Sequence, residues 1–168
     1  MGRDKALLPV EGTSLVERTA RLVRGAAGNV TLIGAPERYS ALGLPVAADL
    51  VPEIGPLGGL HTALEMTRSD WNLVVACDMP RLTEEFLRGM LEAARASGAV
   101  CLVPETAAGM HPLCAVYHRR AQAAVVSAIA HKRFKMHDLL KTLGAAAWPV
   151  ADASLLENVN TPVEWGAR

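Results

Sequence analysis

The sequence has no excess of charge of either sign. Its 168 residues contain 17 Lys and Arg against 17 Asp and Glu, which gives a formal net charge of zero. Proteins that bind a nucleic acid or an anionic membrane along one face carry a basic surplus, so this balance argues against both kinds of partner. The apolar fraction of 51% argues against a disordered chain. The length and composition predict one folded domain.

Cysteines and long apolar runs are also scarce. Cys77, Cys101 and Cys114 are odd in number and show no C-x-x-C spacing, so they fit reduced thiols packed as small hydrophobic residues. No uncharged apolar run approaches the ~20 residues that cross a bilayer. The charges at positions 3–5 are unlike the start of a secretory signal. We expect a cytoplasmic protein.

Several catalytic signatures are missing. Residues 55–59, Gly-Pro-Leu-Gly-Gly, match neither the G-x-G-x-x-G of dinucleotide-binding folds nor the G-x-x-x-x-G-K-[ST] of P-loops. No two of the five histidines stand four residues apart around a carboxylate, as in zinc hydrolases. No serine lies in a G-x-S-x-G elbow. The sequence gives no support for these three chemistries.

The chain alternates helical patterns with short apolar strand patterns. Helices are predicted at about 15–26, 56–67, 84–97, 120–130 and 135–143, with another after Pro162, and strands at 29–34, 45–49, 71–77, 99–103, 112–117 and 146–150. The first two strands are expected to be buried on both faces. The strand at 112–117 is expected to pair antiparallel with 99–103 at the edge of the sheet. The alternation predicts a three-layer α/β fold, with helices on both faces of a mostly parallel sheet and one antiparallel strand.

Two carboxylates follow predicted strands at the edge where α/β folds bind ligands. Asp78 comes directly after the apolar strand at 71–77. A carboxylate there either holds a hard cation such as Mg²⁺, together with substrate phosphates, or caps its own turn. Asp49 ends a weaker strand pattern, and turn capping is the favoured interpretation for it.

Three further features have two interpretations each. Lys5 either neutralises a phosphate or is an ordinary exposed lysine, and the pattern favours the second. The glycines at 55–59 allow either a close approach of a ligand or tight packing of the helix on the sheet. The basic run at 132–135 is either a solvated loop or a contact for a second anionic substrate.

Taken together and in order, these segments resemble a known family. They are the Met-Gly-Arg-Asp-Lys-Ala-Leu-Leu at 1–8, Asp49, the Gly-Pro-Leu-Gly-Gly-Leu at 55–60, the Ala-Cys-Asp-Met-Pro at 76–80, the His-Pro at 111–112 and the Glu-Asn-Val-Asn-Thr-Pro at 157–162. The combination is similar to molybdenum cofactor guanylyltransferases, which have a nucleoside-diphospho-sugar transferase-like, Rossmann-like fold. The glycines of the second motif and the Asp-Met-Pro resemble the guanylyl branch of the superfamily. The cytidylyl branch tends to carry serines and Asp-Gln-Pro at these places.

The resemblance implies Mg²⁺-dependent transfer of GMP from GTP to the terminal phosphate of molybdopterin, or of its molybdenum-loaded form, with release of pyrophosphate. Its motifs imply that Lys5 contacts the nucleotide phosphates, that Asp78 binds Mg²⁺, and that both are catalytic. They place Asp49, with Gly58 and Gly59, in the guanine-nucleotide pocket. On the pterin side they imply His111, Pro112, Arg133, Asn158 and Asn160. Transient contact with other proteins of cofactor biosynthesis is also implied.

The resemblance starts in the middle of a motif. The family has a first strand and a Leu-Ala-Gly-Gly-x-Ser-x-Arg loop directly before its Met-Gly-x-Asp-Lys, and this loop gives backbone N–H groups to the nucleotide. We therefore expect residues 1–168 to form a single nucleotidyltransferase domain that is N-terminally incomplete. A sheet without its first strand has two unpaired edges or a gap at its centre.

Two other functions stay open. One is a cytidylyl or sugar-phosphate nucleotidyltransferase of the same fold. The other is a non-catalytic module that binds a nucleotide or a pterin without the phosphate loop.

Overall fold

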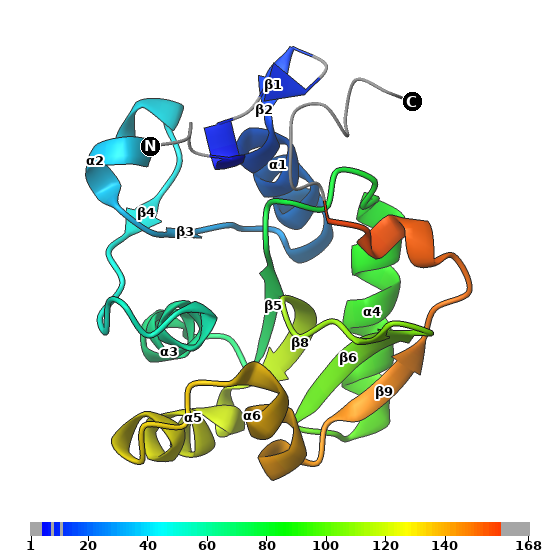
Figure 1. Cartoon of the computed structure of the whole chain (residues 1–168). Helices are drawn as coiled ribbons and strands as arrows, with labels where there is room; N and C mark the ends of the chain where they lie inside the picture. The colour runs from blue at the N-terminus through cyan, green and yellow to red at the C-terminus, as the bar shows by residue number, and fades with distance from the viewer. Residues whose placement is uncertain (1–4, 8, 11, 159–168) are drawn as a thin grey trace.

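The computed structural model describes residues 5–7, 9, 10 and 12–158. Its main body is a five-stranded sheet, shown in Figure 1. The strands are β5 (Trp71–Val75), β8 (Cys114–His118), β6 (Cys101–Thr106), β7 (Gly109–Met110) and β9 (Ala146–Pro149). β8 lies between β5 and β6 and is antiparallel to both, whereas β9 is parallel to β6. β5, β6 and β9 therefore point the same way, and the predicted α/β class is confirmed.

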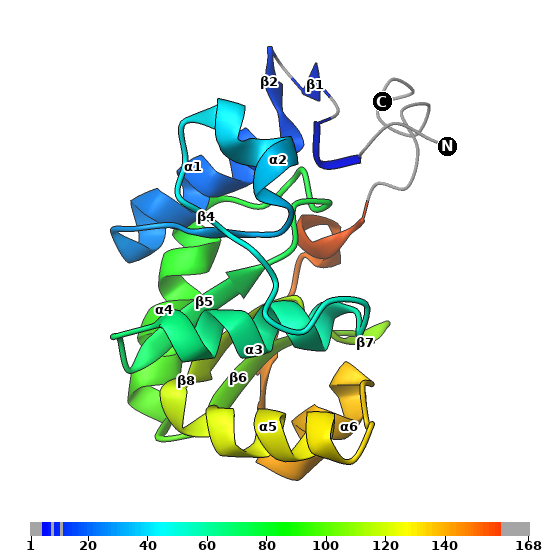
Figure 2. The same cartoon turned by 90° about the vertical axis from the view of Figure 1, so that its left-hand side faces the viewer.

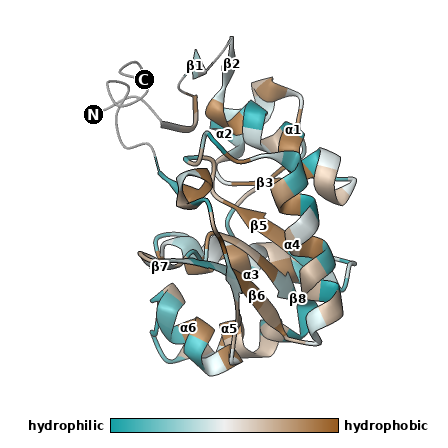
Figure 3. Ribbon diagram, turned by 90° about the vertical axis from the view of Figure 1, so that its right-hand side faces the viewer, coloured by the Kyte–Doolittle hydropathy of each residue, from teal (hydrophilic) through white to brown (hydrophobic). Residues whose placement is uncertain are grey.

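Helices cover both faces of this sheet and make it the middle of three layers (Figure 1). One face is covered by α1 (Leu15–Ala27) and α4 (Glu84–Ser97), and the other by α3 (Pro56–Met66), α5 (Gln122–Ala130) and α6 (Met136–Leu143). Alternation along the strands explains the two cores. In β6, Cys101 and Val103 pack toward α3, α5 and α6, while Leu102 packs toward α4. Figure 3 shows the apolar residues concentrated on the strands and the inner helix faces.

The helix boundaries follow from local capping. At the start of α1, Ser14 Oγ accepts a hydrogen bond from the Glu17 N–H at 3.3 Å, and Glu17 Oε2 accepts one from the Ser14 N–H at 2.9 Å. This is the reciprocal capping box that the sequence predicts. Thr83 caps α4 by accepting a hydrogen bond from the Phe86 N–H at 3.2 Å. The predicted helices at 56–67 and 135–143 are confirmed within one residue at each end.

The region before α3 departs from the prediction. β3 (Leu32–Ile33) and β4 (Val46–Ala47) pair in parallel with each other and form a separate two-stranded sheet. Both are only half-buried, so the expectation of burial on two faces is wrong for these strands. The physical reason is the missing neighbour: the described residues place no strand between β3 and β5, and both strands keep an unpaired edge there.

The position of β8 is a second correction. The sequence predicts this strand at the edge of the sheet, but it lies between β5 and β6. Its residues Cys114, Ala115, Val116 and Tyr117 are fully buried, as expected for a strand with a neighbour on each edge and helices over both faces. The Tyr117 hydroxyl finds a partner inside the core by donating to the Pro112 carbonyl at 2.9 Å.

Short elements complete the described chain. They are the 3₁₀ turns η1 (Lys5–Leu7), η2 (Ser40–Leu42), η3 (Arg119–Ala121) and η4 (Ala153–Leu156), the hairpin β1 (Pro9–Val10) and β2 (Thr13–Ser14), and the helix α2 (Pro36–Tyr39). The helix predicted after Pro162 lies outside the described residues. No helix within the described ranges combines the length and the apolar character needed to cross a membrane.

Candidate functional site

The candidate site lies at the carboxyl edge of the sheet, where β5 ends. β5 and β8 are antiparallel, with Val75 opposite Cys114, so the end of one strand meets the start of the other. The Ala76 N–H donates to the Leu113 carbonyl at 2.7 Å and extends this pairing by one step. The segments that carry Asp78 and Pro112 are therefore neighbours, although they are far apart in the sequence.

A cavity of about 370 Å³ opens at the same edge. Among the residues that line it are Ala6, Gly59, Cys77 and Leu113. These are the sequence neighbours of Lys5, Gly58, Asp78 and Pro112, so the cavity brings four of the predicted segments together. The side chain of Lys5 lies outside the described part of the structure, and its phosphate-binding role stays a prediction.

Asp78 has the environment of a cation ligand. Its Oδ1 atom is closed off from solvent and has no hydrogen-bond partner among the described residues, which also give its carboxylate no capping contact with its own turn. A carboxylate oxygen that is buried without a donor is costly, and a bound cation removes that cost. The described residues gather no group of three or more His, Cys, Asp or Glu side chains that could hold a metal ion, at Asp78 or elsewhere. The single carboxylate of Asp78 fits Mg²⁺, which is commonly held by one or two carboxylates together with water and substrate phosphates.

Asp49 caps its own turn, as the sequence pattern favours. Its Oδ1 atom accepts hydrogen bonds from the Val51 N–H and from the Thr62 hydroxyl, each at 3.1 Å. The described residues give no hydrogen bond to Oδ2. Capping therefore occupies one oxygen of the Asp49 carboxylate and leaves the other as an acceptor.

Gly58 packs directly against this turn. A Cβ atom on Gly58 would lie 2.6 Å from the Val51 carbonyl oxygen and 2.8 Å from Asp49 Oδ2. Neither atom has room to move without disturbing the turn, so this position requires glycine. At Gly59 the nearest atom to an added Cβ is in Ile33, at 3.9 Å. The tight-packing interpretation thus holds for Gly58, and Gly59 borders the cavity.

The sequence pattern did not reveal two residues of the site. Thr62 is fully buried on α3 and bonds to Asp49. A hydroxyl residue one helical turn after Gly58 of the glycine motif was the available signal. The second residue is Arg18 on α1, whose Nη2 donates to the Leu82 carbonyl at 3.2 Å and ties α1 to the segment that follows Asp78.

The predicted pterin-side residues are placed less closely together. Leu156 of η4 packs in the same core as Met79 and Leu82, so the exposed Asn158 follows a segment held against the Asp78 loop. Asn160 lies outside the described residues. Arg133 is exposed on the loop between α5 and α6, and it does not line the cavity at the sheet edge. Figure 2 shows this loop on the same side of the molecule as β7.

His111 is partly buried beside the end of β7. The ring Nε2 atom of His111 lies 3.0 Å from Thr106 Oγ1, and the backbone N–H of His111 donates to the Pro104 carbonyl at 3.0 Å. Burial lowers the pKa of His111, because a charged imidazole loses solvation there. The neutral ring is therefore the form that the fold favours.

Cys101 and Cys114 supply no nucleophile to this edge. Burial raises the pKa of the Cys101 and Cys114 thiols to about 12 each, so both stay protonated near neutral pH. This agrees with the interpretation of these two cysteines as small hydrophobic residues.

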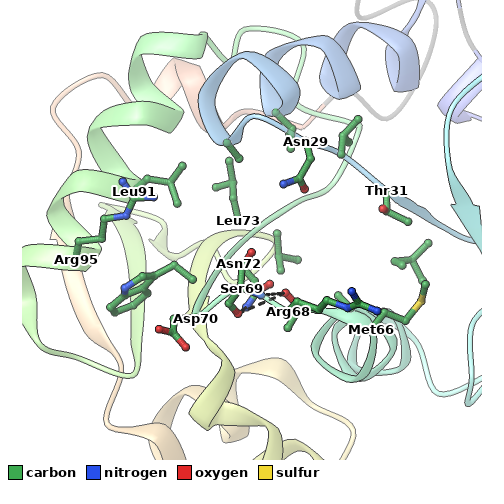
Figure 4. Close-up of a pocket in the computed structure, with 18 residues that line it drawn as sticks. Asn29, Thr31, Met66, Arg68, Ser69, Asp70, Asn72, Leu73, Leu91 and Arg95 are labelled. Atoms are coloured by element: carbon green, nitrogen blue, oxygen red, sulfur yellow. Dashed lines mark hydrogen bonds between the residues drawn. The ribbon is translucent and has the colours of Figure 1, made fainter.

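A second cavity, of about 610 Å³, continues along β5 toward its amino end. Figure 4 shows Thr31 on one side of this cavity and Leu73 of β5 on another. The two cavities share Val23 of α1, Ala63 of α3 and Leu73 among their lining residues. Together they form a groove between β3 and β5, with α1 and α3 on its two sides, and we call this the strand groove.

Comparison with known proteins agrees with the fold and shows the family. The MobA-like NTP transferase domain matches residues 1–147. A probable molybdenum cofactor guanylyltransferase from Synechococcus elongatus is 31% identical over 175 residues, which cover 99% of this chain and 90% of that protein. One from Pelotomaculum thermopropionicum is 37% identical over 134 residues, which cover 79% of this chain and 64% of that protein.

Solved structures show the same fold. The molybdopterin-guanine dinucleotide biosynthesis protein A from Archaeoglobus fulgidus has a TM-score of 0.79 at 22% identity, covering 98% of this chain and 88% of its own. The 2-C-methyl-D-erythritol 4-phosphate cytidylyltransferase from Thermus thermophilus has a TM-score of 0.73 at 18% identity, covering 96% and 90%. The fold is thus that of the nucleotidyltransferases. The chain belongs to the MobA-like NTP transferase family.

Substitution of Gly58 by alanine tests the contact between α3 and the Asp49 turn. The added Cβ meets a backbone oxygen and a carboxylate, so Gly58→Ala is expected to lower the free energy of unfolding by about 1–3 kcal/mol. Gly59→Ala is the matched control and is expected to change it by less than about 1 kcal/mol, because its Cβ has room and alanine favours a helix. Urea unfolding measures both. Equal effects of the two substitutions would contradict the described packing.

The pH dependence of stability tests the environment of His111. The folded-state pKa lies below the ordinary 6.5, so between the two values the unfolded chain binds more protons than the folded one. This contribution to stability is present above about pH 6.5 and is lost as the pH falls toward the folded pKa. His111→Gln should therefore reduce the loss of stability between about pH 7 and 5, measured by urea unfolding. An NMR titration that placed the folded pKa above 6.5 would contradict this account.

Proposed function

We propose that the protein transfers GMP from GTP to the terminal phosphate of molybdopterin, or of its molybdenum-loaded form, in a reaction that requires Mg²⁺. The observation that carries this proposal is the buried, unpartnered carboxylate oxygen of Asp78, placed beside the cavity at the sheet edge in a chain of the MobA-like NTP transferase family. The names of the relatives from Synechococcus and Pelotomaculum support the guanylyl reaction. The buried, protonated thiols of Cys101 and Cys114 suit the reducing cytoplasm.

The reaction is a nucleotidyl transfer. An oxygen of the acceptor phosphate forms a bond to the α-phosphorus of GTP, and the bond from that phosphorus to the bridging oxygen breaks, with pyrophosphate as the leaving group. Such a transfer needs little covalent work from the protein and depends on positioning and on neutralising charge. Bound Mg²⁺ neutralises and orients the nucleotide phosphates, and Asp78 is the residue that would hold it.

Residues of this chain would recognise the base, the phosphates and the pterin substrate. Asp49 Oδ2 is an open acceptor, and guanine presents two adjacent donors, N1–H and the 2-amino group, that a carboxylate accepts. Gly58 has no side chain to separate α3 from the Asp49 turn, so the helix start stays close to this acceptor. Lys5 would neutralise phosphate charge, and the segment around His111 and Pro112 would face the pterin substrate.

The proposed activity can be tested directly. The purified protein, given GTP, MgCl₂ and molybdopterin, is expected to form the guanine dinucleotide and pyrophosphate, detected by chromatography. Removal of Mg²⁺ with EDTA should abolish turnover. Asp78→Asn keeps the size of the side chain but weakens its hold on a cation, and should lower the rate by at least about 100-fold. Glu92→Gln, on the exposed side of α4, is the matched control and should keep full activity.

Two results would count against this function. CTP used in preference to GTP would favour the cytidylyl alternative. Tight binding of GTP without turnover would favour the non-catalytic module, provided that the protein carries an added N-terminal strand that fills the strand groove.

We also propose that the described residues form an incomplete single domain, and that the strand groove seats a β-strand supplied by residues that precede Lys5. Within the described chain, β5 pairs only with β8, so its other edge offers free backbone N–H and C=O groups. The walls are apolar on both sides, with Val16 and Ala20 on α1 and Leu60 on α3. The occupant therefore has to be an extended segment that is apolar on both faces.

The start of the described chain also supports the proposal that this strand comes from residues that precede Lys5. Ala6 is buried and lines the groove near Cys77, at the carboxyl end of β5. A strand parallel to β5 would end at this edge, where Ala6 lies. A segment of about six residues spans the five residues of β5, at about 3.3 Å per residue.

An N-terminal extension tests this proposal. Six Val and Ile residues placed before Met1 should fill the groove and raise the free energy of unfolding by at least about 2 kcal/mol, because several apolar side chains become buried. An extension of six Gly and Ser residues is the control and should have no such effect. Urea unfolding gives the stability, and the fluorescence of Trp71, which lines the groove, should shift to the blue with the apolar extension alone. Equal responses to both extensions would show that the groove does not accept a strand.

A further inference from the structure

The Asp49 carboxylate is held by a side chain that has no access to solvent. Thr62 on α3 is 0% exposed. Its hydroxyl oxygen accepts a hydrogen bond from the Leu50 N–H at 2.9 Å, and it lies 3.1 Å from Asp49 Oδ1 and 3.0 Å from the Gly58 carbonyl oxygen. Thr62 therefore joins the helix that begins at the site to the side chain of Asp49 and to the backbone N–H of Leu50.

The proton of this hydroxyl decides how the carboxylate is held. A hydroxyl has one proton to donate, and here two acceptors compete for it, Asp49 Oδ1 and the Gly58 carbonyl. A hydrogen bond to an ionised carboxylate is stronger than one to a neutral carbonyl, so the ionised Asp49 draws the proton. Oδ1 is then engaged by the Val51 N–H as well as by Thr62. Two donors on one oxygen fix the rotation of the carboxylate and the direction in which Oδ2 points.

We infer that Thr62 is a positioning residue for base recognition, which deepens and rests on the proposed function. By holding Oδ1, it presents Oδ2 in the orientation that accepts the adjacent N1–H and 2-amino groups of guanine. Thr62 itself touches no substrate. Its effect should therefore appear in nucleotide affinity and in the choice of base, and not in the rate of the chemical step, which occurs at the phosphates near Asp78.

A merely structural role for Thr62 predicts something different. If the residue only tied α3 to the turn, its loss would lower stability and weaken every nucleotide equally. Inosine separates the two roles, because ITP lacks the 2-amino group of GTP and is otherwise the same ligand. Loss of a fixed acceptor for that amino group lowers the ratio of GTP affinity to ITP affinity, whereas general loosening leaves the ratio unchanged.

The test uses the full chain and two variants. Thr62→Val has nearly the same shape but no hydroxyl, and Thr62→Ser keeps the hydroxyl and is the matched control. Titration calorimetry with GTP and with ITP, each with Mg²⁺, gives the dissociation constants. For Thr62→Val we expect GTP affinity to fall about 10-fold and the GTP to ITP ratio to fall by a similar factor, because one hydrogen bond to a charged group is lost. Thr62→Ser should stay within about 3-fold of the unchanged protein in both quantities, and its kcat, like that of Thr62→Val, should be nearly constant.

The outcomes separate the two proposals. An unchanged GTP to ITP ratio in Thr62→Val would overturn the positioning role and leave the proposed function intact. A fall in kcat with unchanged affinity would also overturn it. If the unsubstituted protein bound no GTP, the proposed function and the positioning role would both fail. Urea unfolding of both variants, at protein concentrations used for calorimetry, confirms that folded protein is compared.

Discussion

The insertion of β8 between β5 and β6 is the constraint on which the rest of the structure depends. This strand is antiparallel to both neighbours and fully buried over four residues, so it joins the two halves of the main sheet and separates the two apolar cores. Its start lies opposite the end of β5, which brings the His111 segment to the edge that carries Asp78. Tyr117 strengthens this arrangement, because its hydroxyl reaches from the core to the Pro112 carbonyl. The geometry of the site is therefore set by the packing of one inner strand.

Much of this arrangement could be predicted from the sequence, because it rests on local signals. The capping pair of Ser14 and Glu17 marks the start of α1, and the apolar run that stops before Asp78 marks both a strand and the place of a ligand group. The predicted site positions at Asp49 and Gly58 also come together, since strand ends and helix starts meet at one edge of an α/β sheet. The order of the motifs along the chain is what identified the family.

The remaining features depend on contacts between distant residues and leave no local mark. The inner position of β8 follows from which strand pairs with which, and a hydropathy pattern gives the burial of a strand but not its neighbours. β3 is short and half-buried because the described residues place no strand on its second edge, whereas its own sequence pattern predicts a buried strand. Thr62 and Arg18 escape a motif search because each acts through hydrogen bonds to backbone or carboxylate groups that only the folded chain brings near.

The strand groove has a consequence for how the protein behaves at high concentration. An unpaired strand edge is a template on which other chains can add, and this is a common origin of aggregation. Here α1 and α3 lie on either side of the edge of β5, so a strand that is part of another folded protein cannot pair with it. Only a narrow, extended segment can enter. The two helices thus protect the open edge from unspecific association while leaving it accessible to a single strand.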